Sequence, residues 1–267
     1  MFSFFSNKNT GKKEKNGVTT ITSNTFVLFL RMLFMTVVSL YTVRCVLNGL
    51  GVVDYGVLNA VAGIVTASTC VSSVLALSTQ RFYSFAMGKG QHERLREIFS
   101  VSLNLVVILS IILLIIFITL GSWFVNTQLN IPPSRQSAAQ WLLILSLISF
   151  IFSILQIPYM GAVFAHEDME IYALISILDC ICKLIVAVNI KNTPINSLIF
   201  YGIGFAVIAL FDLIAYIIIA KHKYKECNYI KVTSKETLKE LISFSGWTFY
   251  GSVAGVSMTQ GSTILLN

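Results

Sequence analysis

The chain has 267 residues, of which 55% are hydrophobic and only 12% are Asp, Glu, Lys or Arg. A soluble domain carries about 25% charged residues, so this composition excludes a water-soluble globule and favours a protein that lies in a bilayer. The net charge of +7 could indicate a nucleic-acid partner. The basic residues, however, stand in short blocks between apolar runs, which is the pattern of membrane loops, so no nucleic-acid partner is expected.

Seven apolar stretches are long enough to cross a bilayer, which needs roughly 20 helical residues. They are predicted over residues 24–48, 56–87, 98–124, 137–165, 171–190, 197–220 and 241–267. The sequence therefore predicts an all-α, polytopic membrane helix bundle. Its expected divisions are a cytosolic basic tail (1–23), a six-helix transmembrane lobe (24–220), a cytosolic basic linker (221–240) and a seventh helix (241–267). The seventh helix ends in an apolar run without a polar tail, as a truncated protein would.

The basic residues predict the orientation of the bundle. Fourteen of the 19 Lys and Arg residues fall on the side of the N-terminal tail, and only Arg44, Arg135 and Lys191 fall on the other side. Because cytosolic loops carry the excess of Lys and Arg, the N-terminus is predicted to be cytoplasmic. The tail lacks the pattern of a cleaved signal peptide.

The first span contains an arginine. A mostly apolar run from Asn24 carries Arg31 near its start and breaks at Asn48-Gly49-Leu50-Gly51. An arginine inside a span costs roughly 2.5–3.5 kcal/mol on insertion scales, and Arg31 lies about 10 Å from the cytosolic end at 1.5 Å per residue. Two interpretations remain open. The side chain reaches back to the interface, or it points into a cavity and attracts an anion.

The second span is interrupted by small polar residues. Asn59, Thr66, Ser73 and Gln80, with Gly63, fall near one helical face. Such residues let helices approach closely, and they also line wet cavities, so both interpretations stay open for this polar stripe. In the fourth span, Pro158 predicts a bend, because proline removes a backbone hydrogen bond.

The fifth and sixth spans carry further charges. Asp179 and Lys183 are four residues apart, which places them on one face in the favoured order, so they form a structural pair or leave Lys183 to meet an anionic substrate. Asp212 has no charged partner at helical spacing. A carboxylic acid held away from water favours its neutral form, so Asp212 and Asp179 are candidates for ion coupling. A salt bridge from Asp212 to Arg31 or Lys183 is the alternative.

Nothing in the sequence indicates catalysis. It contains no P-loop, no GxSxG and no metal cluster, and its three histidines fall in predicted loops. Cys180 and Cys182 lie about 200° apart around a helix, so they cannot share a metal. All five cysteines are expected to be free. We therefore predict no enzyme, no cofactor and no metal site.

Several short segments, in their order and spacing, resemble the polysaccharide (oligosaccharide-lipid) flippases of the MOP exporter superfamily. They are Arg31-Met32, Tyr41 to Gly56, Ser78 to Phe82, Ile131 to Arg135, Pro158-Tyr159 with Ala165 to Met169, Tyr224 to Cys227, and Leu241 to Trp247. The resemblance runs through nearly all of residues 22–250.

The resemblance implies a fold and a function. Such proteins have two six-helix lobes around a central cavity, so this chain would hold one MOP-type lobe and the first helix of the next. They move an undecaprenyl-pyrophosphate-linked oligosaccharide across the bacterial inner membrane by alternating access, for surface polysaccharide biosynthesis. By position, Arg31 and then Lys183 are the expected cavity cations. Membrane lipids and polysaccharide polymerase machinery are the expected partners.

Three other functions stay open. A multidrug exporter of the same superfamily would use acidic residues such as Asp212 for cationic drugs, although Arg31 opposes that function. A membrane polymerase or acyltransferase would need clustered catalytic residues or a large outer loop, and neither is present in the predicted layout. A non-transporting fragment of a broken gene would account for the apolar end of the chain.

Overall fold

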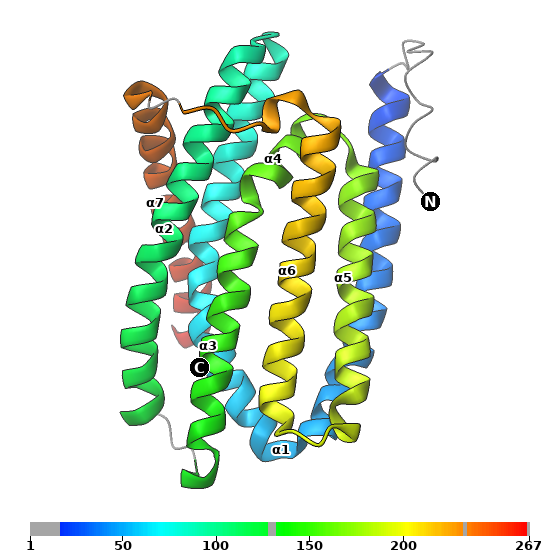
Figure 1. The fold of residues 1–267 in the computed structure, drawn as a ribbon, viewed down its shortest axis with the longest axis vertical. Helices are drawn as coiled ribbons and strands as arrows, with labels where there is room; N and C mark the ends of the chain where they lie inside the picture. The colour runs from blue at the N-terminus through cyan, green and yellow to red at the C-terminus, as the bar shows by residue number, and fades with distance from the viewer. Residues whose placement is uncertain (1–16, 128–131, 232–233, 266–267) are drawn as a thin grey trace.

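The computed structural model describes residues 17–127, 132–231 and 234–265, and in these ranges it holds helices and short connections without a strand. The long helices run side by side as a bundle, and the short helix α4 continues from the end of α3 (Figure 1). The predicted all-α polytopic bundle is confirmed. The elements are α1 (Gly17–Gly88), α2 (His92–Thr127), α3 (Pro133–Leu155), α4 (Ile157–Ala165), α5 (Met169–Asn189), η2 (Ile190–Asn192), α6 (Ser197–Lys223), η3 (Lys225–Cys227) and α7 (Lys235–Leu265).

Helix α1 is two helices joined by a kink. Gly51 has φ 77° and ψ 172°, which is not helical backbone, and the chain reverses direction around it (Figure 1). Only glycine reaches this conformation without steric cost. The break predicted at residues 48–51 is thus located at Gly51. We call residues 17–50 the first limb of α1 and residues 52–88 its second limb.

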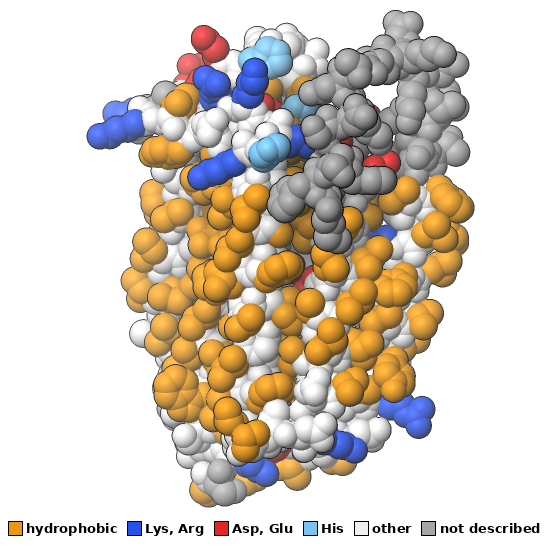
Figure 2. Space-filling view, turned by 45° about the vertical axis from the view of Figure 1, so that its right-hand side comes forward, with side chains coloured by type: hydrophobic (Ala, Val, Ile, Leu, Met, Phe, Trp, Pro, Cys, Tyr) orange, Lys and Arg blue, Asp and Glu red, His pale blue; other side chains and the backbone are white. Residues whose placement is uncertain are grey.

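Five described helical stretches are long and apolar enough to span a membrane by length and composition. They are Thr25–Gly63, His92–Trp123, Arg135–Ala165, Met169–Asn192 and Ser197–Lys223. The second limb of α1 and α7, which were also predicted as spans, run alongside them in the bundle (Figure 1). Figure 2 shows hydrophobic side chains over the middle of the molecule, basic side chains toward both ends and histidines at the upper end.

Several helix boundaries differ from those predicted, and α1 and α2 begin at Gly17 and His92, before the predicted starts at residues 24 and 98. The bend expected at Pro158 begins at Gln156, which separates α3 from α4. Helix α7 begins at Lys235, inside the predicted linker, because its first turns bind α2. Thr237 donates to Glu97 Oε1 over 2.5 Å, and Arg94 lies 3.1 Å from Glu240.

Close contacts at small residues bring α5 and α6 together. A Cβ added at Gly204 of α6 would lie 2.6 Å from Val186 Cγ1 of α5. On the other side of α6, a Cβ at Gly202 would lie 3.0 Å from Leu145 of α3. Small residues of this kind are typical of membrane helix interfaces. Helix α6 therefore packs closely against both α3 and α5.

Candidate functional site

Arg31 points toward α5. Its Nε donates to Ser176 Oγ over 2.5 Å, and one terminal nitrogen donates to the Tyr172 hydroxyl over 3.1 Å. The guanidinium carbon also lies 4.3 Å from the centre of the Tyr172 ring, which is a cation–π contact. Arg31 is half-buried. The first limb of α1 thus presents its arginine to hydroxyl groups within the bundle.

The predicted pair of Asp179 and Lys183 forms. Lys183 Nζ lies 2.9 Å from the Asp179 carboxylate, and it also lies 5.5 Å from the ring centre of Phe205 on α6. The Lys183 side chain is 37% exposed and the Asp179 side chain 16%. Lys183 therefore pairs with a carboxylate while part of its side chain stays exposed.

Asp212 joins this pair from α6. It interacts electrostatically with both Asp179 and Lys183 of α5. Its Oδ1 is buried and has no hydrogen-bond partner among the described residues. Tyr216, one turn further along α6, interacts in turn with Tyr172, Arg31, Asp179 and Asp212.

The four charged residues therefore lie in one place. Arg31, Asp179, Lys183 and Asp212, with the hydroxyl residues Tyr172, Ser176 and Tyr216, form what we call the charge network, contributed by α1, α5 and α6. The fold brings together residues that are distant in the chain, since Arg31 and Ser176 are 145 positions apart.

The polar stripe lies apart from the charge network, on the second limb of α1. Asn59 and Ser73 are exposed, and Gln80 is half-buried. The side chain of Thr66 lies outside the described part of the structure. Exposed polar side chains on a membrane helix indicate a surface that faces water or another helix rather than lipid.

Sequence reasoning missed an ion pair between a buried carboxylate and a half-exposed arginine at the opposite end of the bundle. Asp54, which is 4% exposed, lies just after the kink of α1, and its Oδ1 is 3.1 Å from Arg135 Nε at the start of α3. Both residues lie in the sequence segments that carry the family resemblance. That resemblance was the feature of the sequence that could have pointed to them. The pair ties the kink to α3.

A second unpredicted cluster lies where α4 meets α5. His166 bonds to Glu226 and stacks on the Tyr224 ring at 4.2 Å. The Tyr224 hydroxyl donates to Asp168 over 2.5 Å, and Lys223 lies 2.8 Å from the same carboxylate. We call these five residues the loop cluster, and it fastens the end of α6 to the α4–α5 connection.

Burial shifts the pKa values of several groups in and beside the loop cluster. The pKa of the Cys227 thiol is raised to about 12 by burial, with the Glu226 carboxylate adding to the shift. The pKa of Tyr224 is raised by burial and by its bond to Asp168. Burial is the largest single influence on Glu226 and opposes its ionisation, but the hydrogen bond to His166, a backbone hydrogen bond and the nearby histidines together leave its pKa lowered.

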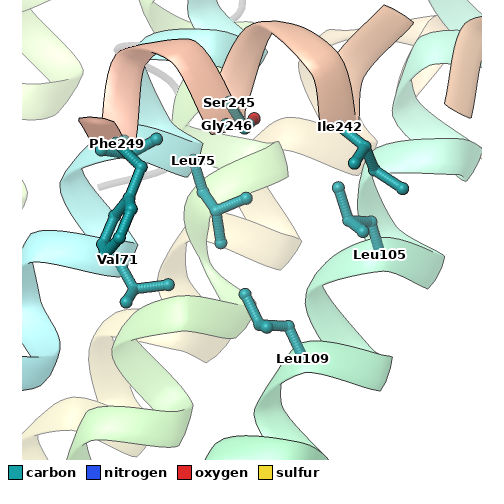
Figure 3. Close-up of a pocket in the computed structure, with 9 residues that line it drawn as sticks. Val71, Leu75, Leu105, Leu109, Ile242, Ser245, Gly246 and Phe249 are labelled. Carbon is teal, nitrogen blue, oxygen red and sulfur yellow. The ribbon is translucent and has the colours of Figure 1, made fainter. Parts of the chain in front are cut away.

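An apolar groove lies under α7. It has a volume of about 250 Å³ and is bounded by α7 on one side and by α2 and the second limb of α1 on the other. Figure 3 shows Leu75, Leu105 and Leu109 facing α7 across it, with Phe249 and Val71 at one end. Its lining carries no charged side chain. Within the described ranges, no group of three His, Cys, Asp or Glu residues could hold a metal ion.

The arrangement of helices matches a solved transporter. A MOP superfamily transporter from Pyrococcus furiosus Vc1 (DSM3638) superposes with a TM-score of 0.71 at 15% sequence identity. The chain therefore shares the fold of that transporter over the region that the two have in common. The match covers 90% of this chain and 54% of that one, so the chain spans about half the length of the transporter. The binding pocket of that transporter is described as having reverse polarity, which suggests a different function for it.

No family model matches the sequence, and no curated protein matches it either. The likeness of structure establishes the fold of the bundle. The substrate has to be argued from the chain's own residues.

Proposed function

We propose that the chain is the N-terminal lobe, with the first helix of the second lobe, of an exporter for undecaprenyl-pyrophosphate-linked oligosaccharide in surface polysaccharide biosynthesis. The observation that carries the proposal is the placement of Arg31 and Lys183 in one network within the bundle. Cations held at membrane depth are costly and mark the path of an anion. The pyrophosphate head group supplies that anion, while the prenyl chain stays in lipid.

The polar stripe supports a cavity beside the lobe. Asn59 and Ser73 are exposed on the second limb of α1, and such side chains avoid lipid. In alternating access, this face would meet water or the second lobe as the cavity opens and closes. The protein would lie in the bacterial inner membrane with its N-terminus in the cytoplasm, in contact with membrane lipids and the polysaccharide polymerase machinery.

The test is loss of surface polysaccharide. We expect the double variant Arg31→Ala/Lys183→Ala, made at the native locus, to lower surface polysaccharide at least tenfold, with the protein present in the membrane at normal amount. The matched control removes two cations outside the charge network, as Arg44→Ala/Lys191→Ala, and both of these residues are exposed. Normal polysaccharide in the Arg31/Lys183 variant would eliminate the proposed role of the cations.

A multidrug exporter is the second candidate, and the acidic half of the charge network favours it. Asp212 has an oxygen without a hydrogen-bond partner among the described residues and lies beside Asp179, and a cationic drug would pair with these carboxylates. Drug sensitivity separates the two functions. An exporter of cationic drugs would protect cells through Asp179 and Asp212, and surface polysaccharide would not change in Asp179→Asn or Asp212→Asn.

A further inference from the structure

The connection between α6 and α7 lies against the side of α2. The backbone N–H of Ile230 donates to Ser100 Oγ over 3.0 Å, and the Tyr229 hydroxyl donates to Asn104 Oδ1 over 3.3 Å. Figure 1 shows this connection crossing α2 below its upper end. The two hydrogen bonds thus fix the position of residues 229 and 230 along α2.

This position corresponds to the surface of the membrane. Glu97 is the last charged residue of α2, since residues 98–127 carry no charge. At 1.5 Å per residue, Ser100 lies about 4.5 Å and Asn104 about 10 Å further along the helix. Tyr229 is 52% exposed although its hydroxyl is bonded. A tyrosine with a polar partner for its hydroxyl and an exposed ring is typical of the level at which head groups meet acyl chains.

The connection turns one side toward the bundle and another side outward. Its buried residues are Tyr224, Glu226 and Cys227. Its exposed residues include Lys225, Tyr229 and Lys231, which we call the linker face. Neither lysine of the linker face forms an ion pair with an acid among the described residues. Both ammonium groups are therefore available to an anion outside the chain.

The sequence around the linker face is also basic. Residues 221–240 contain six lysines and three glutamates. Two of the glutamates are already bonded, Glu226 to His166 and Glu240 to Arg94. The outward side of this segment therefore carries an excess of positive charge at the level of the membrane surface.

We propose that the linker face binds the phosphate groups of anionic phospholipids, with the Tyr229 ring against the first carbons of their acyl chains. A lysine near the membrane surface contributes the equivalent of about fivefold in affinity for such lipids. A zwitterionic phospholipid has no net charge and should bind less well. A soluble acidic protein is a poorer fit, because it would have to displace lipid from the exposed Tyr229 ring. The inference holds for any substrate that the bundle carries.

The test measures lipid contact at position 229 itself. The native tryptophans are replaced by phenylalanine at Trp123, Trp141 and Trp247, and Tyr229→Trp supplies the fluorophore. The full chain is reconstituted in mixed vesicles of phosphatidylcholine and phosphatidylglycerol, in which one of the two lipids carries brominated chains that quench tryptophan. The quenching gives the relative affinity of the two lipids. We expect at least a fivefold preference for phosphatidylglycerol, which Lys225→Ala/Lys231→Ala should abolish.

Two control variants separate charge from packing. Lys89→Ala/Lys191→Ala removes two exposed lysines outside the linker face and should keep the preference. Lys225→Arg/Lys231→Arg retains both charges and should keep it as well. Equal quenching by the two lipids overturns the inference, and so does a preference that survives Lys225→Ala/Lys231→Ala. Quenching by neither lipid would place residue 229 in water and leave the lysines to a soluble acidic partner, which also overturns the inference.

Discussion

Two hydroxyl groups and one aromatic ring stabilise Arg31 inside the bundle. A guanidinium group has five N–H donors and cannot lose its proton, so its position depends on acceptors that neighbouring helices supply. Ser176 and Tyr172 supply them from successive turns of α5. The ring of Tyr172 also lies against the charge. Each of these contacts can be removed separately by substitution.

Ser176→Ala is expected to destabilise the protein by about 1.5–3 kcal/mol, the range for a hydrogen bond to a charged group. Tyr172→Phe, which removes one hydrogen bond but keeps the ring, should cost less. Thermal unfolding in detergent measures both. Tyr41→Phe changes an exposed tyrosine of the same limb and serves as the control. Equal stability of Ser176→Ala and wild type would show that Arg31 is held by other contacts.

The loop cluster predicts a pH-dependent stability. The pKa of Glu226 is lowered in the folded protein, so its contribution is present above the unfolded value of about 4.3 and is lost as the pH falls through the folded value. The melting temperature of wild type should therefore drop more steeply between about pH 5 and 3 than that of Glu226→Gln. Glu236→Gln, which removes an exposed acid of α7, should behave like wild type.

At the scale of single helices, the glycines divide into those in contact and those in open space. Gly204 brings α6 against α5 at the level of the charge network, whereas a Cβ on Gly246 would meet nothing within 4 Å. The two positions therefore form a matched pair for testing how closely α5 and α6 must approach. They differ in packing and share a helical backbone.

We expect Gly204→Ala to destabilise the bundle by about 1–3 kcal/mol through overpacking against Val186. Gly246→Ala should be neutral or stabilising by about 0.5–1 kcal/mol, because alanine loses less backbone entropy in a helix. Denaturant unfolding followed by circular dichroism measures both. A Gly204→Ala variant as stable as wild type would mean that α5 and α6 can separate without cost.

Sequence patterns predicted the helices far better than the contacts between them. The spans followed from apolar length, the kink at Gly51 from a glycine pair, and the Asp179–Lys183 pair from helical spacing. The start of α7 was placed too late, because residues 235–240 are polar apart from Leu238 and become helical by binding Arg94 and Glu97 of α2. The partners of Arg31 carry no local signal, since they lie more than 140 positions away in the chain.

For the whole molecule, the basic residues predict which end of the bundle faces the cytosol. Lys89, between α1 and α2, and Lys191, between α5 and α6, are both exposed and lie at opposite ends of the helices. Cysteines placed at these two positions in a cysteine-free background should react with a membrane-impermeant maleimide from opposite sides. In intact cells we expect labelling at position 191 and protection at position 89. The reverse pattern would invert the predicted orientation.

The distance in sequence between Arg31 and its partners affects how the protein is made. Ribosomes add about 5–20 residues per second, so roughly 7–30 s separate the synthesis of Arg31 from that of Ser176, 145 positions later. During this interval the guanidinium group has neither hydroxyl acceptor and would stay near the lipid phosphates at the membrane surface. The first limb of α1 would then lie close to the membrane surface and reach its final depth only after α5 has been inserted. The first helix to be synthesised would therefore reach its place only after α5, while α6 and α7 follow later in the chain.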